Sequence, residues 1–137
     1  DGAKGYVKQA NATNIPYDDN SFDIVVSNSM LEHIFLDDMD KVLSEMFRVT
    51  KEYIFMNLDC SDIPIILKKD EDVPIEHEGH AIQGHVTLLP KQWWDNKLEE
   101  YGTIDVPKME AFNKLDKYFI HGGHSTRFIL RKNKNEI

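Results

Sequence analysis

Two histidines, His33 and His85, have side chains suited to acid–base chemistry. The unperturbed pKa of histidine lies near neutrality, so either imidazole could take a proton from a substrate hydroxyl at physiological pH. His33 directly follows an acidic residue, Glu32. The sequence equally allows a histidine at a helix start whose ring nitrogens are bonded by neighbouring groups. We therefore keep both interpretations of His33 open.

A second group of histidines surrounds His85. His77 and His80 precede it, together with Glu76 and Glu78. Spacings of three and five residues do not match a regular zinc signature, which favours a solvated loop over a metal-binding one. A metal-binding protein built on this loop remains the least favoured hypothesis. Cys60, the only cysteine, has no cationic activator nearby in sequence, so nucleophilic catalysis is not expected.

The elements that must position these side chains read as a strand–helix–strand unit. Residues 22–27 are apolar on consecutive positions, as in a buried parallel strand covered by helices on both faces. Residues 36–49 carry an apolar stripe at helical spacing, and residues 53–58 form a second apolar run. A right-handed crossover is expected for this order. Ser27 and Asn28 end the first strand, at the sheet edge where ligands bind in open α/β folds.

The remainder of the chain reads less clearly. Residues 59–87 are irregular, and residues 89–102 predict a helix with Pro90 in its first turn and Gly102 just past its end. Strands are expected at residues 103–106 and 125–131, and a weak one around Tyr6 and Val7. The turn at residues 121–124 is best explained as a hairpin connection.

Composition excludes several classes of protein. The 137 residues suit one domain with a modest core, and 41% hydrophobic with 29% charged residues is typical of globular chains. A net charge of −8 argues against a nucleic-acid binder. No apolar run approaches the roughly 20 residues that span a bilayer. We expect a cytoplasmic protein with no membrane partner.

One loop carries a family resemblance. The stretch Asn11-Ala-x-x-Ile-Pro-Tyr17, followed by Asp-x-x-Phe-Asp-x-Val, is similar to a pattern of class I S-adenosylmethionine-dependent methyltransferases. The resemblance is strongest over residues 5–58 and implies methyl transfer to a small-molecule acceptor. It implies that the Asn11 side-chain oxygen accepts a hydrogen bond from the adenine amino group. It also implies that the backbone N–H of Ala12 donates a hydrogen bond to an adenine ring nitrogen. Ser27 and Asn28 would contact the methionine portion.

Two further stretches resemble substrate-side segments of such enzymes. Leu31-Glu32-His33 resembles the L-E-H signature, in which the histidine lies near the transferred methyl group. Some relatives carry E-x-x-E-H here and bind a metal, but Ser29 replaces the first glutamate, so no metal is expected. Residues 85–94 resemble H-V-x-x-x-P-x-x-W-W, which implies acceptor contacts for His85 and for Trp93 or Trp94. Glu32, in the Leu31-Glu32-His33 stretch, is a further substrate-side candidate. Alternatively, the tryptophans are packing anchors.

The Gly-rich turn and the ribose-binding acidic residue of this family are not found in the sequence. We therefore expect a truncated Rossmann-like α/β fold: a single partial methyltransferase domain over residues 1–137. It would have two or three parallel strands, flanking helices and a C-terminal antiparallel strand or hairpin. The strand at residues 22–27 would have an open edge, covered by a second copy or by residues 6–8. The alternative function is a non-catalytic fragment that associates through this edge, so enzyme activity stays open.

Overall fold

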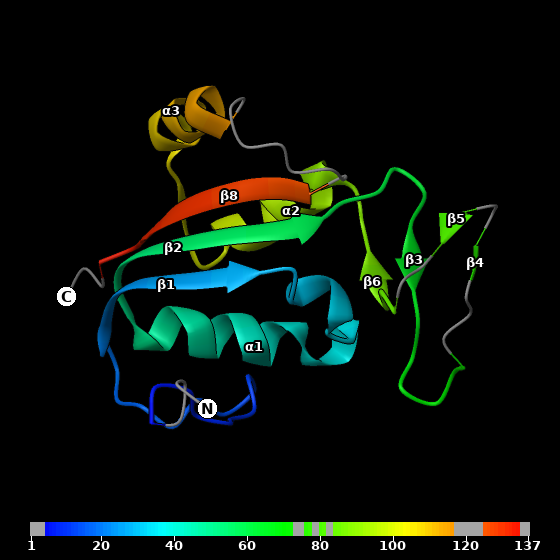
Figure 1. The fold of residues 1–137 in the computed structure, drawn as a ribbon, viewed down its shortest axis with the longest axis horizontal. Helices are drawn as coiled ribbons and strands as arrows, with labels where there is room; N and C mark the ends of the chain where they lie inside the picture. Colours follow the sequence, from blue (N-terminus) through cyan, green and yellow to red (C-terminus); the bar gives the residue numbers. More distant parts are fainter. Residues whose placement is uncertain (1–4, 73–75, 78–79, 82–83, 117–124, 135–137) are drawn as a thin grey trace.

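A four-stranded mixed sheet organises the chain (Figure 1). The computed structural model describes residues 5–72, 76–77, 80–81, 84–116 and 125–134. The strand order is β1-β2-β8-β7, with β1 parallel to β2 and the other pairs antiparallel. The elements of the sheet and its helices are β1 (Phe22–Asn28), a 3₁₀ turn η1 (Leu31–His33), α1 (Leu36–Val49), β2 (Thr50–Asp59), α2 (Lys91–Glu99), β7 (Gly102–Ile104), α3 (Val106–Asp116) and β8 (Ser125–Lys132).

The predicted order of strand, helix and strand is confirmed, but the expected burial of the first strand is wrong: β1 lies at the edge of the sheet, and Ser27 is its only buried residue. Helix α1 buries its predicted stripe, including Met39, Val42 and Leu43, because these positions recur on one helical face. The chain then returns as β2, and Val25 lies beside Ile54 in the parallel register. This crossover brings the carboxyl ends of β1 and β2 to the same edge of the sheet.

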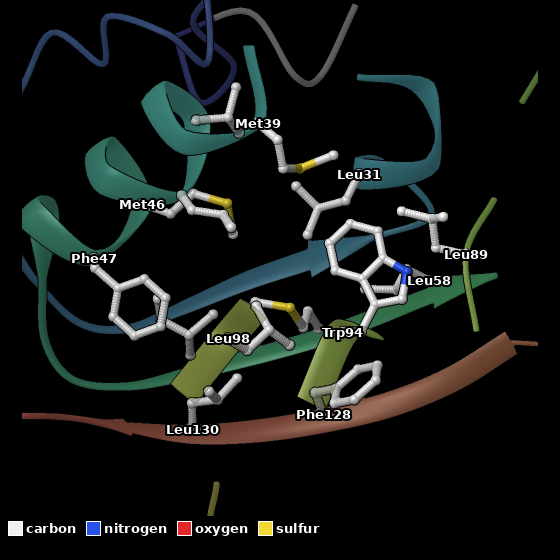
Figure 2. Packing of buried hydrophobic residues seen from close by; sticks show 14 residues of the cluster. Leu31, Met39, Met46, Phe47, Leu58, Leu89, Trp94, Leu98, Phe128 and Leu130 are labelled. Atoms are coloured by element: carbon white, nitrogen blue, oxygen red, sulfur yellow. The ribbon is translucent and has the colours of Figure 1, made fainter. Parts of the chain in front are cut away.

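The core lies between α1, α2 and one face of the sheet (Figure 2). Trp94 and Leu98 of α2 are fully buried and pack with Phe128 and Leu130 of β8. Leu31 of η1 belongs to the same cluster. Burial of these side chains removes apolar area from water and fixes η1 against the end of the sheet.

The C-terminal half differs from the sequence predictions in detail. Pro90 precedes α2 instead of lying in its first turn, and α2 ends at Glu99. Gly102 begins strand β7, where a Cβ atom would lie 2.7 Å from Phe47 Cε1 and 2.8 Å from the carbonyl oxygen of Arg131. Glycine is therefore required by close packing and not by a helix end. Helix α3 was not predicted.

The expected irregular region contains short paired strands. They are β3 (Ile65–Ile66), β4 (Glu76–His77), β5 (His80–Ala81) and β6 (Thr87–Leu88). β3 pairs with β6, and β4 pairs with β5. The segment from Gly84 to Leu88, here called the strap, runs beside η1 and returns the chain to α2. The predicted hairpin turn at residues 121–124 lies outside the described residues.

Strand β1 forms an edge of the sheet, and within the described part of the chain it pairs only with β2. Ile24 and Val26 are 51% and 71% exposed. The prediction that residues 6–8 cover this edge is wrong, because the N-terminal segment lies beside α1 and away from β1 (Figure 1). Tyr6 and Val7 are almost fully exposed and form no strand. None of the described helices is long and apolar enough to cross a membrane.

Candidate functional site

The loop that precedes β1 is fixed to α1 by two charged side chains. Glu45 Oε2 accepts a hydrogen bond from the backbone N–H of Ile15 at 2.7 Å. Arg48 donates to the carbonyl oxygens of Ile15 and Tyr17 at 2.9 and 2.8 Å and forms an ion pair with Asp19. These bonds add partners to backbone groups of a loop in which the Ile15 carbonyl also accepts from the N–H of Tyr17 at 2.8 Å.

Glu45 and Arg48 also bond each other on one face of α1, with 2.7 Å between Arg48 Nε and Glu45 Oε1. The Arg48 guanidinium and then the Ile15 amide lower the pKa of Glu45 from 4.5 to about 2. Glu45 and Asp19 in turn raise the pKa of Arg48. Sequence reasoning missed this pair, although a three-residue spacing of opposite charges on a predicted helix was visible.

Asn11 closes a local turn at the start of this loop. Its Oδ1 accepts hydrogen bonds from the backbone N–H and the hydroxyl of Thr13, at 2.9 and 2.8 Å. The Asn11 carbonyl oxygen accepts from the N–H of Asn14 at 3.0 Å. The Thr13 hydroxyl can rotate away, so the Asn11 oxygen remains chemically able to accept a ligand amine.

The turn after β1 has an unusual backbone. Ser29 has a φ of 49°, a left-handed value that is uncommon outside glycine and often marks functional turns. Its N–H donates to the carbonyl of Asn57 at 2.9 Å, and the Asn57 amide donates to Asn28 Oδ1 at 3.3 Å. Ser27 is buried, and its hydroxyl has no hydrogen-bond partner in the described structure. Asn28 is exposed. Of Ser27 and Asn28, the turn therefore exposes only the side-chain amide of Asn28 to solvent.

His33 and His85 lie together although 52 positions separate them in the chain. Their ring centroids are 4.8 Å apart and nearly perpendicular. Glu32 completes the cluster, with one potential ligand atom of each residue within 4.8 Å of the others. His85 Nε2 is also 3.7 Å from Asp59 Oδ2. Sequence reasoning named both histidines but could not place them side by side.

Three hydrogen bonds hold the strap against η1 and the turn that follows it. The N–H of Val86 donates to the carbonyl of Glu32 at 2.9 Å, and the Thr87 hydroxyl donates to the carbonyl of Ile34 at 2.7 Å. His33 Nδ1 lies 3.0 Å from the carbonyl oxygen of Gly84. A carbonyl oxygen only accepts, so Nδ1 carries the proton and Nε2 keeps its lone pair.

A surface hollow of about 680 Å³ joins the N-terminal loop to this cluster. Asn11, Ala12 and His33 are among its lining residues, and Ser27 and Asn28 are not. A larger hollow of about 990 Å³ lies at the opposite end of the sheet, around Lys51 and Arg131. The smaller hollow is the better candidate site because it contains side chains able to transfer protons and lies toward the carboxyl end of β1.

The two tryptophans have different environments. Trp94 is fully buried in the core, so it has the packing role that the sequence allowed as an alternative (Figure 2). Trp93 is partly buried against the same cluster, with its ring centroid 4.9 Å from that of Trp94. Only Trp93 retains surface that an acceptor could contact.

Comparisons with known proteins agree with the architecture. Residues 2–53 match the family described as the methyltransferase domain. An uncharacterized protein of Haemophilus influenzae is 32% identical over 103 residues, which are 75% of this chain and 40% of that protein. The chain thus spans less than half the length of this curated relative.

Solved structures share the fold at low sequence identity. A protein of Pyrococcus horikoshii matches 96% of this chain and 64% of its own, at 14% identity and a TM-score of 0.60. The cyclase SpnF matches 91% and 56%, with a TM-score of 0.55 and 14% identity. A Bacillus halodurans protein described as a "putative methyltransferase" matches over 90% of this chain and 72% of its own, with a TM-score of 0.51 and 16% identity.

The fold is thus that of the Rossmann-like methyltransferases. Residues 2–53 of the chain, in addition, resemble the methyltransferase domain.

Proposed function

We propose that this chain contributes to methyl transfer from S-adenosylmethionine to a small-molecule acceptor. The observation that carries the proposal is the shared hollow, in which the loop at Asn11 and Ala12 meets His33. Its volume of about 680 Å³ lies within the usual range for small-molecule sites. The Asn11 oxygen at its wall offers the acceptor that an adenine amino group requires.

The contribution of the protein to such a reaction is positioning and proton transfer. S-adenosylmethionine supplies an electrophilic methyl group when bound. The Gly84 carbonyl keeps the His33 proton on Nδ1. His33 Nε2 could then accept the proton that an acceptor hydroxyl would lose as its oxygen bonds to the methyl carbon and the carbon–sulfur bond of the donor breaks, leaving the donor as a thioether. His85, in edge contact with the His33 ring, is the second candidate base.

Calorimetric titration of S-adenosylmethionine into the chain tests this proposal. Replacing Asn11 with Ala should weaken binding roughly 2- to 12-fold, the worth of one neutral hydrogen bond. Asn96→Ala is a matched control, because Asn96 is an exposed asparagine on α2 whose side chain bonds Gln92. If neither heat nor thermal stabilisation appears at millimolar ligand, the proposal is wrong for this chain.

One observation favours the second candidate, a non-catalytic protein that associates through its sheet edge. Strand β1 is an edge strand whose Ile24 and Val26 are exposed, and such edges pair with other chains. The SpnF match also shows that this fold occurs in a protein named as a cyclase, so fold alone does not fix the chemistry. Association without any cofactor binding would favour this candidate.

A further inference from the structure

We propose that Glu32, His33 and His85 bind a divalent transition-metal ion, with Zn²⁺ as the best fit. The three side chains converge from η1 and the strap, and one potential ligand atom of each lies within 4.8 Å of the others. Two imidazole nitrogens and one carboxylate oxygen are the donors of open, three-ligand zinc sites. Mg²⁺ and Ca²⁺ prefer oxygen ligands throughout and fit this set poorly.

The environment of the Glu32 carboxylate favours cation binding. Its side chain is fully buried, and neither carboxylate oxygen has a hydrogen-bond partner in the described structure. Burying an unpaired carboxylate is costly, and buried charges in proteins are generally paired or bound to metals. A bound divalent ion would provide both the opposite charge and the bonding partner that this side chain lacks.

The two histidine rings are also oriented for metal binding. The hydrogen bond from His33 Nδ1 to the Gly84 carbonyl fixes the ring and leaves Nε2 as the ligand atom. Metal-binding histidines usually donate their other nitrogen in this way. Asp59, 3.7 Å from His85 Nε2, lies where a carboxylate can orient the second ring. The site thus has ligands and groups that orient them.

Metal binding requires only a small contraction. Ligand atoms around a tetrahedral zinc lie roughly 3.4 Å apart, given bond lengths of about 2.0–2.2 Å. The present 4.8 Å spread exceeds this by little more than one ångström. The bonds from Val86 and Thr87 tie the strap to η1, so the backbone segments that carry the three ligands are already held side by side.

No metal was predicted from the sequence, because the local pattern supplied only two potential metal ligands, Glu32 and His33. Ser29 lies where the metal-binding pattern has its first glutamate, and the third ligand here comes from a distant segment. The inference stands on the site residues and does not depend on methyl transfer. With an ion bound, both imidazoles would be ligands, and the ion would replace them in promoting deprotonation of an acceptor hydroxyl.

Titration of Zn²⁺ into the chelator-treated chain, followed by calorimetry and thermal unfolding, tests the site. We expect one ion per chain and a rise in melting temperature, with Mg²⁺ producing neither. Glu32→Gln and His85→Ala should each weaken Zn²⁺ affinity at least tenfold and remove the rise. Glu32→Gln keeps the side-chain shape and removes the buried charge, so its metal-free melting temperature should equal or exceed that of the wild type.

Glu99→Gln is the matched control for Glu32→Gln, because Glu99 is an exposed glutamate on α2 and does not belong to the cluster. This variant should bind Zn²⁺ as the wild type does. The proposal is overturned if Glu99→Gln weakens Zn²⁺ binding as much as Glu32→Gln does, or if either Glu32→Gln or His85→Ala leaves the affinity unchanged. Because metal binding is measured without cofactor, its failure is separate from any failure of the S-adenosylmethionine titration.

Discussion

Arg48 is the side chain on which the candidate cofactor loop most depends. It bonds two loop carbonyls, those of Ile15 and Tyr17, and its partner Glu45 bonds the loop amide of Ile15. Charge-assisted bonds of this kind are stronger than neutral ones and their planar geometry fixes orientation. The loop that ends near the hollow is therefore held by α1 and not by its own turns alone.

Replacing Glu45 with Gln should make the chain less dependent on pH in the acid range. The folded-state pKa of Glu45 is lowered from 4.5 to about 2, so its charge stabilises the fold fully above pH 4.5. That stabilisation is lost as the pH falls from 4.5 to 2. Urea unfolding at pH 7 should show a less stable variant, and at pH 3 a smaller difference from wild type.

Glu99→Gln provides the comparison for this measurement, since Glu99 is an exposed side chain on α2. It should change stability little at either pH. A Glu45→Gln variant that is destabilised equally at pH 7 and pH 3 would show that the carboxylate charge does not anchor the loop.

The sequence allowed prediction of which single residues could do chemistry. It did not allow prediction of which residues lie next to them in the folded chain. His33 and His85 were each selected by residue type and by resemblance, yet their contact depends on the strap returning beside η1. No local pattern encodes a pairing across 52 positions. The sequence likewise could not predict that the buried carboxylate oxygens of Glu32 have no hydrogen-bond partner among the described residues. Burial of a carboxylate follows from tertiary packing alone.

At the scale of elements, periodicity decided which predictions succeeded. The apolar stripe of α1 and the apolar run of β2 are strong signals, and both elements were found where expected. Five of the eleven residues of helix α3 are apolar, but Val106, Phe112 and Leu115 are exposed, so the helix lacks the buried apolar stripe that identifies a core-facing helix. Gly102 was interpreted as a helix stop because its packing against Phe47 cannot be read from spacing.

Gly102→Ala should destabilise the chain by about 1–3 kcal/mol, the usual cost of overpacking. The added Cβ would lie 2.7 Å from Phe47 Cε1 and 2.8 Å from the Arg131 carbonyl oxygen. The ring can shift, but the backbone of β8 is fixed by two ladders. Urea unfolding measures the loss, and Thr103→Ala on the same strand should cost less because Thr103 is exposed. Equal losses would contradict the packing argument.

At the scale of the whole molecule, the sheet is asymmetric. One side ends in β7, a three-residue strand, whereas the other ends in β1, a seven-residue strand. Short edge strands pair poorly with strands of other chains, whereas long apolar edge strands pair readily with them. The described sheet therefore has one side suited to association, and we propose that a second copy of the chain covers it.

Val26→Lys should weaken this association about tenfold, equivalent to roughly 1.4 kcal/mol. Val26 is 71% exposed on β1, so the new charge would be unfavourable in a paired edge while costing the monomer little. Sedimentation velocity over a range of concentrations should show the wild type shifting from monomer to dimer, and the variant shifting only at higher concentration. Leu115→Lys is the control, because Leu115 is 61% exposed on α3 and lies outside the sheet. A monomeric wild type, or an equal effect of both lysines, would mean that β1 is not the contact.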